Sequence, residues 1–83
     1  MRMVIQEAFN VIGDTVIGGG RVEDDSVRLG MAVTVQRAGQ EHASTITQLR
    51  RYDTRLESVA AGLECGVSVG GWRLAPGDVI TGA

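Results

Sequence analysis

The residues best suited to chemistry lie in one stretch of the chain, residues 45–69. This stretch holds the only tyrosine, the only cysteine and the only two adjacent arginines. Within it, Arg50, Arg51 and Tyr52 place two guanidinium groups beside an aromatic ring. Such a set can hold single-stranded nucleic acid, because guanidinium groups bind phosphates and aromatic rings stack on unpaired bases. The alternative, which spacing alone leaves open, is that the ring packs at a strand end while the arginines balance nearby glutamates.

Residues for nucleophilic catalysis are sparse. Cys65 and His42 are the only candidates for a thiol–imidazole pair, and such a pair also needs a third group that orients the base. We expect Cys65, in an alternating apolar run, to be a small core residue, and His42, just after a hairpin turn, to be exposed to solvent. The acidic run at residues 23–25 has the oxygen ligands of a cation site, but a solvated turn is the simpler interpretation. The sequence therefore predicts neither an enzyme nor a bound metal or cofactor.

A run of three glycines, Gly18 to Gly20, invites comparison with a phosphate-binding loop. The comparison fails because no Lys-Ser or Lys-Thr pair follows and no helix start is evident. The glycines instead fall inside a predicted strand. Glycine in a strand usually marks a bulge, a barrel corner or a close approach of two backbones.

The length and net charge of the chain limit its possible domain organisation and binding partners. The chain has 83 residues and a formal net charge of −2, which predicts one domain, residues 1–83, and no overall positive field to hold duplex DNA. All eight basic residues are arginines, which favours planar, bidentate contacts wherever they are functional, although a coding bias is the simpler explanation. No apolar run is long enough to span a bilayer and no apolar leader opens the chain, so we expect a soluble, cytoplasmic protein that does not bind membranes.

Alternating apolar and polar residues, separated by turn signals, point to an all-β protein. Because a small sheet exposes its edges, about six strands in a chain of this length favour a small closed barrel over a sandwich. Turn signals fall at residues 13–14, 38–40 and 75–78. The predicted strands are residues 3–9, 15–22, 31–37, 41–51, 63–69 and 79–80, with a short edge segment at 27–30.

Residues 53–62 have no clear pattern. Leu56, Val59 and Ala60 fall at helical spacing, and Gly62 is a suitable residue to end one turn of helix. A long connection, anchored by two apolar side chains, fits the same residues equally well.

Two motifs resemble the C-terminal domain of bacterial translation initiation factor two, which is itself similar to the second barrel domain of elongation factors. The first is Leu-Arg-Arg-Tyr at residues 49–52, and the second is Gly-Leu-Glu-Cys-Gly at residues 62–66. The spacing between the two motifs matches the family without a gap. Weaker similarities at residues 19–24, 33–39 and 77–80 extend the resemblance over nearly the whole chain.

This resemblance implies a small closed six-stranded antiparallel β-barrel of the translation-factor type. It also implies that the domain binds the formyl-methionyl acceptor end of initiator tRNA and acts with the ribosome through its parent factor; we expect a monomer. A small apolar pocket with a thiol suits a methionine side chain, and arginines suit terminal phosphates. The residues of this sequence that match the family's tRNA site are Arg50, Arg51, Tyr52, Glu64, Cys65, Gly66 and Gly20.

Four positions depart from the family's pattern. Asp53 stands where a second lysine is usual, which reverses a charge at the rim expected to face phosphate. Gly20 stands where a second cysteine is common, Leu63 replaces an aromatic residue, and Arg50 replaces a lysine. The alternative function is a divergent barrel that serves protein–protein contact or structural support without binding tRNA.

Overall fold

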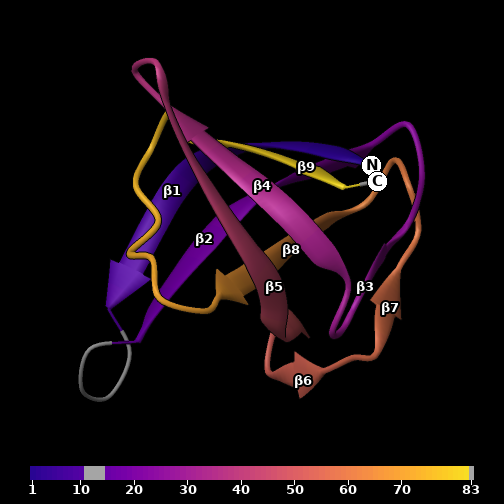
Figure 1. The fold of residues 1–83 in the computed structure, drawn as a ribbon. Helices are drawn as coiled ribbons and strands as arrows, with labels where there is room; N and C mark the ends of the chain where they lie inside the picture. Colours follow the sequence, from indigo (N-terminus) through magenta and orange to yellow (C-terminus); the bar gives the residue numbers. More distant parts are fainter. Residues whose placement is uncertain (11–14, 83) are drawn as a thin grey trace.

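The computed structural model describes residues 1–10 and 15–82, which form β-strands and turns (Figure 1). This described part of the chain contains no helix that could cross a membrane. The strands are β1 (Arg2–Asn10), β2 (Val16–Glu23), β3 (Val27–Arg28), β4 (Ala32–Arg37), β5 (Gln40–Arg51), β6 (Thr54–Arg55), β7 (Ser58–Val59), β8 (Glu64–Val69) and β9 (Val79–Gly82).

Six of the strands close into a barrel. They pair antiparallel in the order β4, β9, β1, β2, β8 and β5, and β5 pairs back with β4. Strand β6 extends β5 as a hairpin, and β3 pairs with β7 in a separate two-stranded sheet. Near the two ends of the chain, the Gly82 N–H donates to the Met1 carbonyl at 2.9 Å. This architecture confirms the predicted closed six-stranded antiparallel barrel, in which closure leaves few strand edges exposed.

Aliphatic side chains fill the interior of the barrel. Side chains alternate between the two faces along each strand, so β4 buries Val33 and Val35 while Gln36, the next residue of the strand, is exposed. The β-branched residues that dominate the chain suit such a pleated, half-buried surface. The largest fully buried apolar side chains are Met3, Ile5, Ile46, Leu49, Ile80, Val22, Val27, Val35 and Val67.

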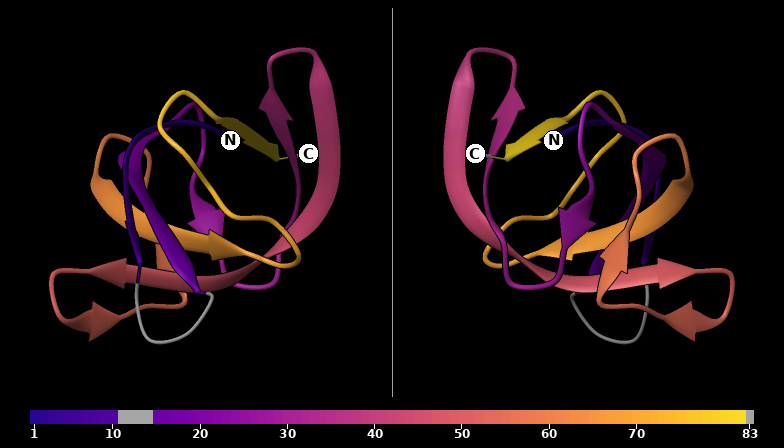
Figure 2. Two further views of the ribbon diagram at one scale, coloured as in Figure 1. Left: turned by 90° about the vertical axis from the view of Figure 1, so that its left-hand side faces the viewer. Right: turned by 90° about the vertical axis from the view of Figure 1, so that its right-hand side faces the viewer.

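Strand β5 takes part in two hairpins, one with β4 and one with β6. It is twelve residues long and pairs with β4 through its first half and with β8 through its second half. Figure 2 shows it as a strongly curved ribbon, and its pairing with β8 shifts register between Ile46 and Gln48. The bent strand expected at residues 41–51 is therefore confirmed. Arg50 and Arg51 are the last two residues of β5. They lie in its hairpin with β6, at the opposite end of the strand from the residues that pair with β4.

The turns occur where the sequence places them, within the described residues. Ala38 and Gly39 form a two-residue turn between β4 and β5, with φ angles of 47° and 83°, a geometry that matches the twist of a hairpin. Gly77, after Pro76, has a φ of 95°, which glycine adopts without strain. The turn predicted at residues 13–14 lies outside the described residues.

The possible turn of helix within residues 53–62 is wrong. Strands β6 and β7 occupy part of this segment, because its apolar residues join neighbouring strands instead of one another. The Leu56 N–H donates to the Leu49 carbonyl at 3.0 Å, and buried Val59 pairs with Val27 of β3. The segment is thus a long connection anchored by apolar side chains, the other possibility that its pattern allows.

One of the three glycines of β2, Gly20, lies where two backbones approach closely. In β1 the pairing shifts register between Ile5 and Glu7, opposite Gly20 and Gly19. A Cβ atom on Gly20 would overlap the carbonyl oxygen of Val4. The bulge and the close approach are two of the three possibilities that glycine in this strand predicts.

Candidate functional site

A row of four paired residues crosses the outer face of the barrel. Glu7 of β1 pairs with Gly19 of β2, Gly19 with Gly66 of β8, and Gly66 with Arg50 of β5. Residues directly opposite each other in a sheet point to the same face. Because the two central residues are glycines, no side chain fills the middle of the row. The result is an open depression with a volume of about 640 Å³, which we call the glycine trough.

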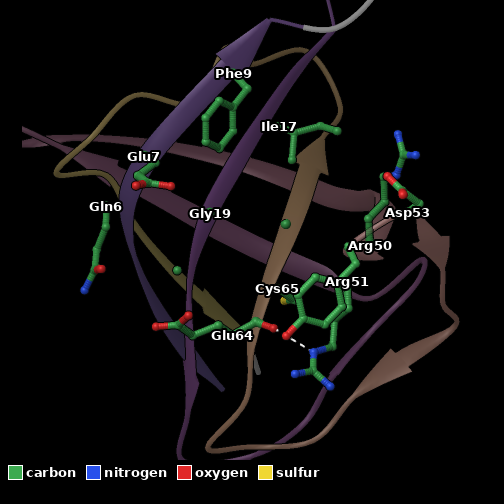
Figure 3. A pocket seen from close by; sticks show the side chains of 13 residues that line it. Gln6, Glu7, Phe9, Ile17, Gly19, Arg50, Arg51, Asp53, Glu64 and Cys65 are labelled. Carbon is green, nitrogen blue, oxygen red and sulfur yellow. Dashed lines mark hydrogen bonds between the residues drawn. The ribbon is translucent and has the colours of Figure 1, made fainter.

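The walls of the glycine trough come from the strands on either side. Figure 3 shows Glu7 and Phe9 of β1 on one side and Arg50 and Arg51 of β5 on the other. Phe9 pairs with Ile17 and keeps 55% of its surface exposed, so the two apolar side chains form one end of the depression. The trough therefore has an apolar end, a glycine floor and a charged rim.

The structure brings every sequence-predicted site residue to the glycine trough. Gly66 lies beside Arg50, and Cys65 pairs with Gly20. The two motifs are thus neighbours at one place on the barrel, as expected from strands that lie side by side, while their role stays a prediction. The residues concerned, all of which line the trough, are Arg50, Arg51, Tyr52, Glu64, Cys65, Gly66 and Gly20.

Arg51 links the two motifs directly. Its Nε donates to the carbonyl oxygen of Glu64 at 2.9 Å, and its guanidinium carbon lies 5.7 Å from the centroid of the Tyr52 ring. This contact is with the backbone of Glu64, and the described residues show no ion pair between either trough arginine and Glu57 or Glu64. Within the described residues, the arginines thus form no direct ion pair with these two glutamates.

Tyr52 is displayed to solvent instead of packed. It lies in the two-residue turn between β5 and β6, with a φ of 55°, and 92% of its surface is exposed. A positive φ is unusual for a bulky residue. The interpretation that Tyr52 packs at a strand end is wrong, and its exposed ring is free to stack on a ligand.

Cys65 forms part of the floor and is largely buried there. It is 7% exposed, and burial raises the pKa of its thiol to about 11, with Arg51 opposing the shift. At neutral pH the group is a protonated thiol, whereas nucleophilic attack needs the thiolate. The expected role as a small buried residue is confirmed, and the sulfur also offers a soft apolar surface to the trough.

The charged groups of the trough lie on different strands. Glu7 lies on β1 and Glu64 on β8, whereas Arg50 and Arg51 lie on β5. Asp53, in the turn after β5, adds a carboxylate to the arginine side. The arginine side suits the anionic part of a ligand, and the glutamate side suits hydrogen-bond donors.

His42 is not an exposed turn residue, as the sequence suggested. It is partly buried, its ring stacks on Trp72 with centroids 5.0 Å apart, and its Nε2 lies 3.2 Å from the Gly70 carbonyl oxygen. It does not line the trough that contains Cys65, so the two do not form a thiol–imidazole pair. No cluster of three or more potential metal ligands occurs in residues 1–10 and 15–82.

Sequence reasoning missed the contribution of β1 to the trough. Gln6, Glu7 and Phe9 line the depression, although Met3 and Ile5 of the same strand face the core. The bulge next to Gln6 changes which face the later residues occupy, and simple alternation does not reveal it. The available signal was Phe9, one of only three aromatic residues, followed by a polar residue at the strand end.

The fold and the trough define a small closed antiparallel β-barrel with a binding depression on its outer face. No protein-family model matches the chain, but several curated relatives do. Translation initiation factor IF-2 of Acidiphilium cryptum is 33% identical over 78 residues, which is 92% of this chain and 9% of the relative. IF-2 of Myxococcus xanthus is 31% identical over 81 residues, or 95% of this chain and 8% of the relative.

IF-2 of Acetivibrio thermocellus is likewise 31% identical over 78 residues, covering 92% of this chain and 8% of the relative. The chain is therefore homologous to a small domain of bacterial translation initiation factor IF-2, which confirms the resemblance found in its motifs. It spans less than a tenth of the length of these relatives.

Proposed function

We propose that the glycine trough binds the formyl-methionyl acceptor end of initiator tRNA, as a domain of an IF-2-type factor. The observation that supports this proposal is the convergence of both sequence motifs on one depression. The motifs lie on β5 and β8, and their residues meet through the Arg50–Gly66 pair and the Arg51–Glu64 hydrogen bond. Partners on the ribosome, a cytoplasmic location and a monomeric state follow from the same proposal.

The chemistry of the trough suits each part of such a ligand. Its volume, about 640 Å³, lies within the range of roughly 300–1,000 Å³ that is usual for small-ligand sites. Phe9, Ile17 and the protonated thiol of Cys65 offer apolar contacts to a methionine side chain. The exposed Tyr52 ring can stack on a terminal base.

The polar rim suits the remaining groups of the ligand. Arg50 and Arg51 can bind phosphates, as guanidinium groups commonly do. Glu7 can accept hydrogen bonds from the amide N–H of a formylated amino acid or from ribose hydroxyls. The trough thus binds and orients its ligand and supplies no nucleophile of its own, because its thiol remains protonated.

Binding of two matched tRNAs to the 83-residue chain tests this function. Isothermal titration would compare formyl-methionyl initiator tRNA with the same tRNA carrying unformylated methionine. We expect tighter binding of the formylated form, because formylation replaces a charged ammonium by a neutral amide, which costs less to bring from water to the apolar end of the trough beside Phe9 and Ile17. Equal affinities, or no binding of either tRNA, would contradict the proposal.

A second function, protein–protein contact without tRNA, is favoured by the charge of the trough. Three carboxylates, from Glu7, Asp53 and Glu64, face two arginines at the depression, and this balance weakens attraction to a polyanion. Backbone amide resonances distinguish the two functions. A shift at residues 50–52 and 64–66 on adding the formylated tRNA supports the first function and excludes the second.

A further inference from the structure

An arginine that neither motif contains lies directly opposite Arg50. Strand β6 pairs with the end of β5 so that Arg55 faces Arg50 across the hairpin and Thr54 faces Arg51. Directly opposite residues point to the same face of a sheet, with Cβ atoms about 5 Å apart. Arg50 lines the glycine trough, so Arg55 extends the same face beyond it. The row across the barrel therefore ends in two neighbouring guanidinium groups.

This pair has no neutralising partner among the described residues. Arg2 and Arg37 form ion pairs, with Glu23 and Asp78, whereas neither Arg50 nor Arg55 forms one within residues 1–10 and 15–82. The Nε of Arg50 is moreover buried and has no hydrogen-bond partner. Like charges directly opposite in a sheet are destabilising, and so is a buried donor without an acceptor. A bound anion would relieve the repulsion between the two guanidinium groups.

We propose that Arg50 and Arg55 form a clamp for a phosphodiester group of a single-stranded nucleic-acid end. Two guanidinium forks side by side match the oxygen pairs of phosphate. The exposed ring of Tyr52 and the glycine trough lie beside the clamp, so a phosphate held there places the following nucleotide at the trough. The identity of the ligand as a tRNA acceptor end rests on the proposed function, but the phosphate chemistry of the clamp does not.

Asp53 opposes the clamp electrostatically. It occupies the turn between Arg50 and Arg55 and lines the arginine side of the trough. Its carboxylate lowers the positive potential at the place where phosphate binds. The net attraction at this rim therefore depends on Arg55, which compensates for the charge of Asp53.

The test compares Arg55→Ala with Arg28→Ala in the 83-residue chain. Arg28 is exposed on β3 and does not line the trough, so its loss changes the net charge equally without touching the clamp. The ligands are a formyl-methionyl oligonucleotide ending in CCA and the same oligonucleotide without the amino acid, each titrated at several salt concentrations. We expect Arg55→Ala to weaken binding about tenfold. We also expect it to reduce the slope of log affinity against log salt by about one, while Arg28→Ala changes neither quantity.

A rescue variant separates a charge effect from a loss of hairpin structure. Asp53→Lys in the Arg55→Ala background restores positive charge to the same rim, and we expect it to recover most of the affinity and the salt slope. If Arg55→Ala binds both oligonucleotides as the Arg28→Ala control does, the clamp is wrong and the proposed function stands. Preferential binding of an acidic peptide by the arginine pair would also overturn the clamp.

Failure of the proposed function leads to a different result. If neither oligonucleotide binds, titration with inorganic pyrophosphate, followed through the Nε resonances of the arginines, tests the clamp alone. Shifts confined to Arg50 and Arg55 support the clamp without a tRNA ligand. No shift at either arginine overturns it.

Discussion

Two partly buried arginines on barrel strands have opposite environments. Arg37 of β4 donates from Nε and Nη2 to the two carboxylate oxygens of Asp78, at 2.6 and 2.7 Å. Its guanidinium carbon also lies 4.6 Å from the centroid of the Trp72 ring. Arg50 of β5 forms no ion pair with the described residues, and its Nε is buried without an acceptor.

The difference separates polar groups that stabilise the fold from polar groups that have no partner among the described residues. Asp78 is 1% exposed and accepts hydrogen bonds from Arg37, from the Trp72 indole and from the Ala75 N–H. Burial acts to raise its pKa, but these hydrogen bonds, led by the one from Arg37, outweigh burial and lower it. We call Asp78 and its three donors, Arg37, Trp72 and Ala75, the Asp78 cluster. Its charged groups are paired with one another, whereas the arginines of the glycine trough have no carboxylate partner among the described residues.

The largest expected effect is the loss of stability on removing the Asp78 carboxylate. Asp78→Ala leaves the Trp72 and Ala75 donors without their acceptor and Arg37 without its counter-ion. We expect the free energy of unfolding to fall by about 2–4 kcal/mol, measured by urea denaturation. Glu41→Ala removes an exposed carboxylate from the β4–β5 hairpin that also carries Arg37, and it should change the free energy of unfolding by less than about 0.5 kcal/mol. Similar stability of the two variants would show that the Asp78 cluster is dispensable.

The second-largest expected effect is a loss of ligand affinity without a loss of stability. A Cβ atom on Gly19 would make only ordinary contacts, 3.9 Å from Glu7 Cβ and 4.0 Å from Phe9 Cε2, so Gly19→Leu places a side chain in the trough without a backbone clash. We expect at least a tenfold loss of affinity for the formyl-methionyl acceptor end, about 1.4 kcal/mol, with an unchanged unfolding midpoint. Ala43→Leu, at an exposed position of β5 outside the trough, is the matched control. Unchanged affinity in Gly19→Leu would place the ligand elsewhere.

The sequence predicted the barrel well because its strands carry strong local signals. Alternating side chains such as Val33 and Val35, together with turn residues such as Gly39, determine strands and hairpins with little help from distant contacts. The meeting of the two motifs was also predictable, because β5 and β8 each carry one. Residues 53–62 were ambiguous because the helical spacing of Leu56 and Val59 is accidental: each is held by a different strand.

The rest of the site depends on features that simple sequence patterns do not reveal. The bulge in β1 changes the face on which Glu7 and Phe9 lie, and no local residue pattern shows where the register shifts. The role of Arg55 depends on its register against Arg50. His42 was predicted to be exposed because its stacking partner, Trp72, lies thirty residues away in sequence.

A smaller effect distinguishes a displayed aromatic ring from a packed one. Tyr52→Asn removes the ring and keeps a residue type that tolerates the positive φ of 55° at this turn. We expect affinity for the acceptor end to fall by about 1–2 kcal/mol because a base loses its stacking partner. Stability should stay the same or rise slightly, because the ring is 92% exposed. Tyr52→Phe should retain most of the affinity, and a marked loss of stability in Tyr52→Asn would mean that the ring serves the fold.

The smallest effect is a change in how stability depends on pH. The pKa of Asp78 in the folded state lies below its ordinary value of 3.8, so the folded protein binds a proton less readily there than the unfolded chain does. Its stabilising contribution is therefore complete above about pH 5 and is lost as pH falls below about 4 through the lower folded pKa. Urea midpoints measured from pH 7 to pH 3 should fall more steeply for the natural chain than for Asp78→Asn, which has no group to titrate at this position. Parallel curves would mean that the Asp78 carboxylate does not contribute to acid unfolding. The contrast between the Asp78 cluster and the glycine trough would then lose its electrostatic basis.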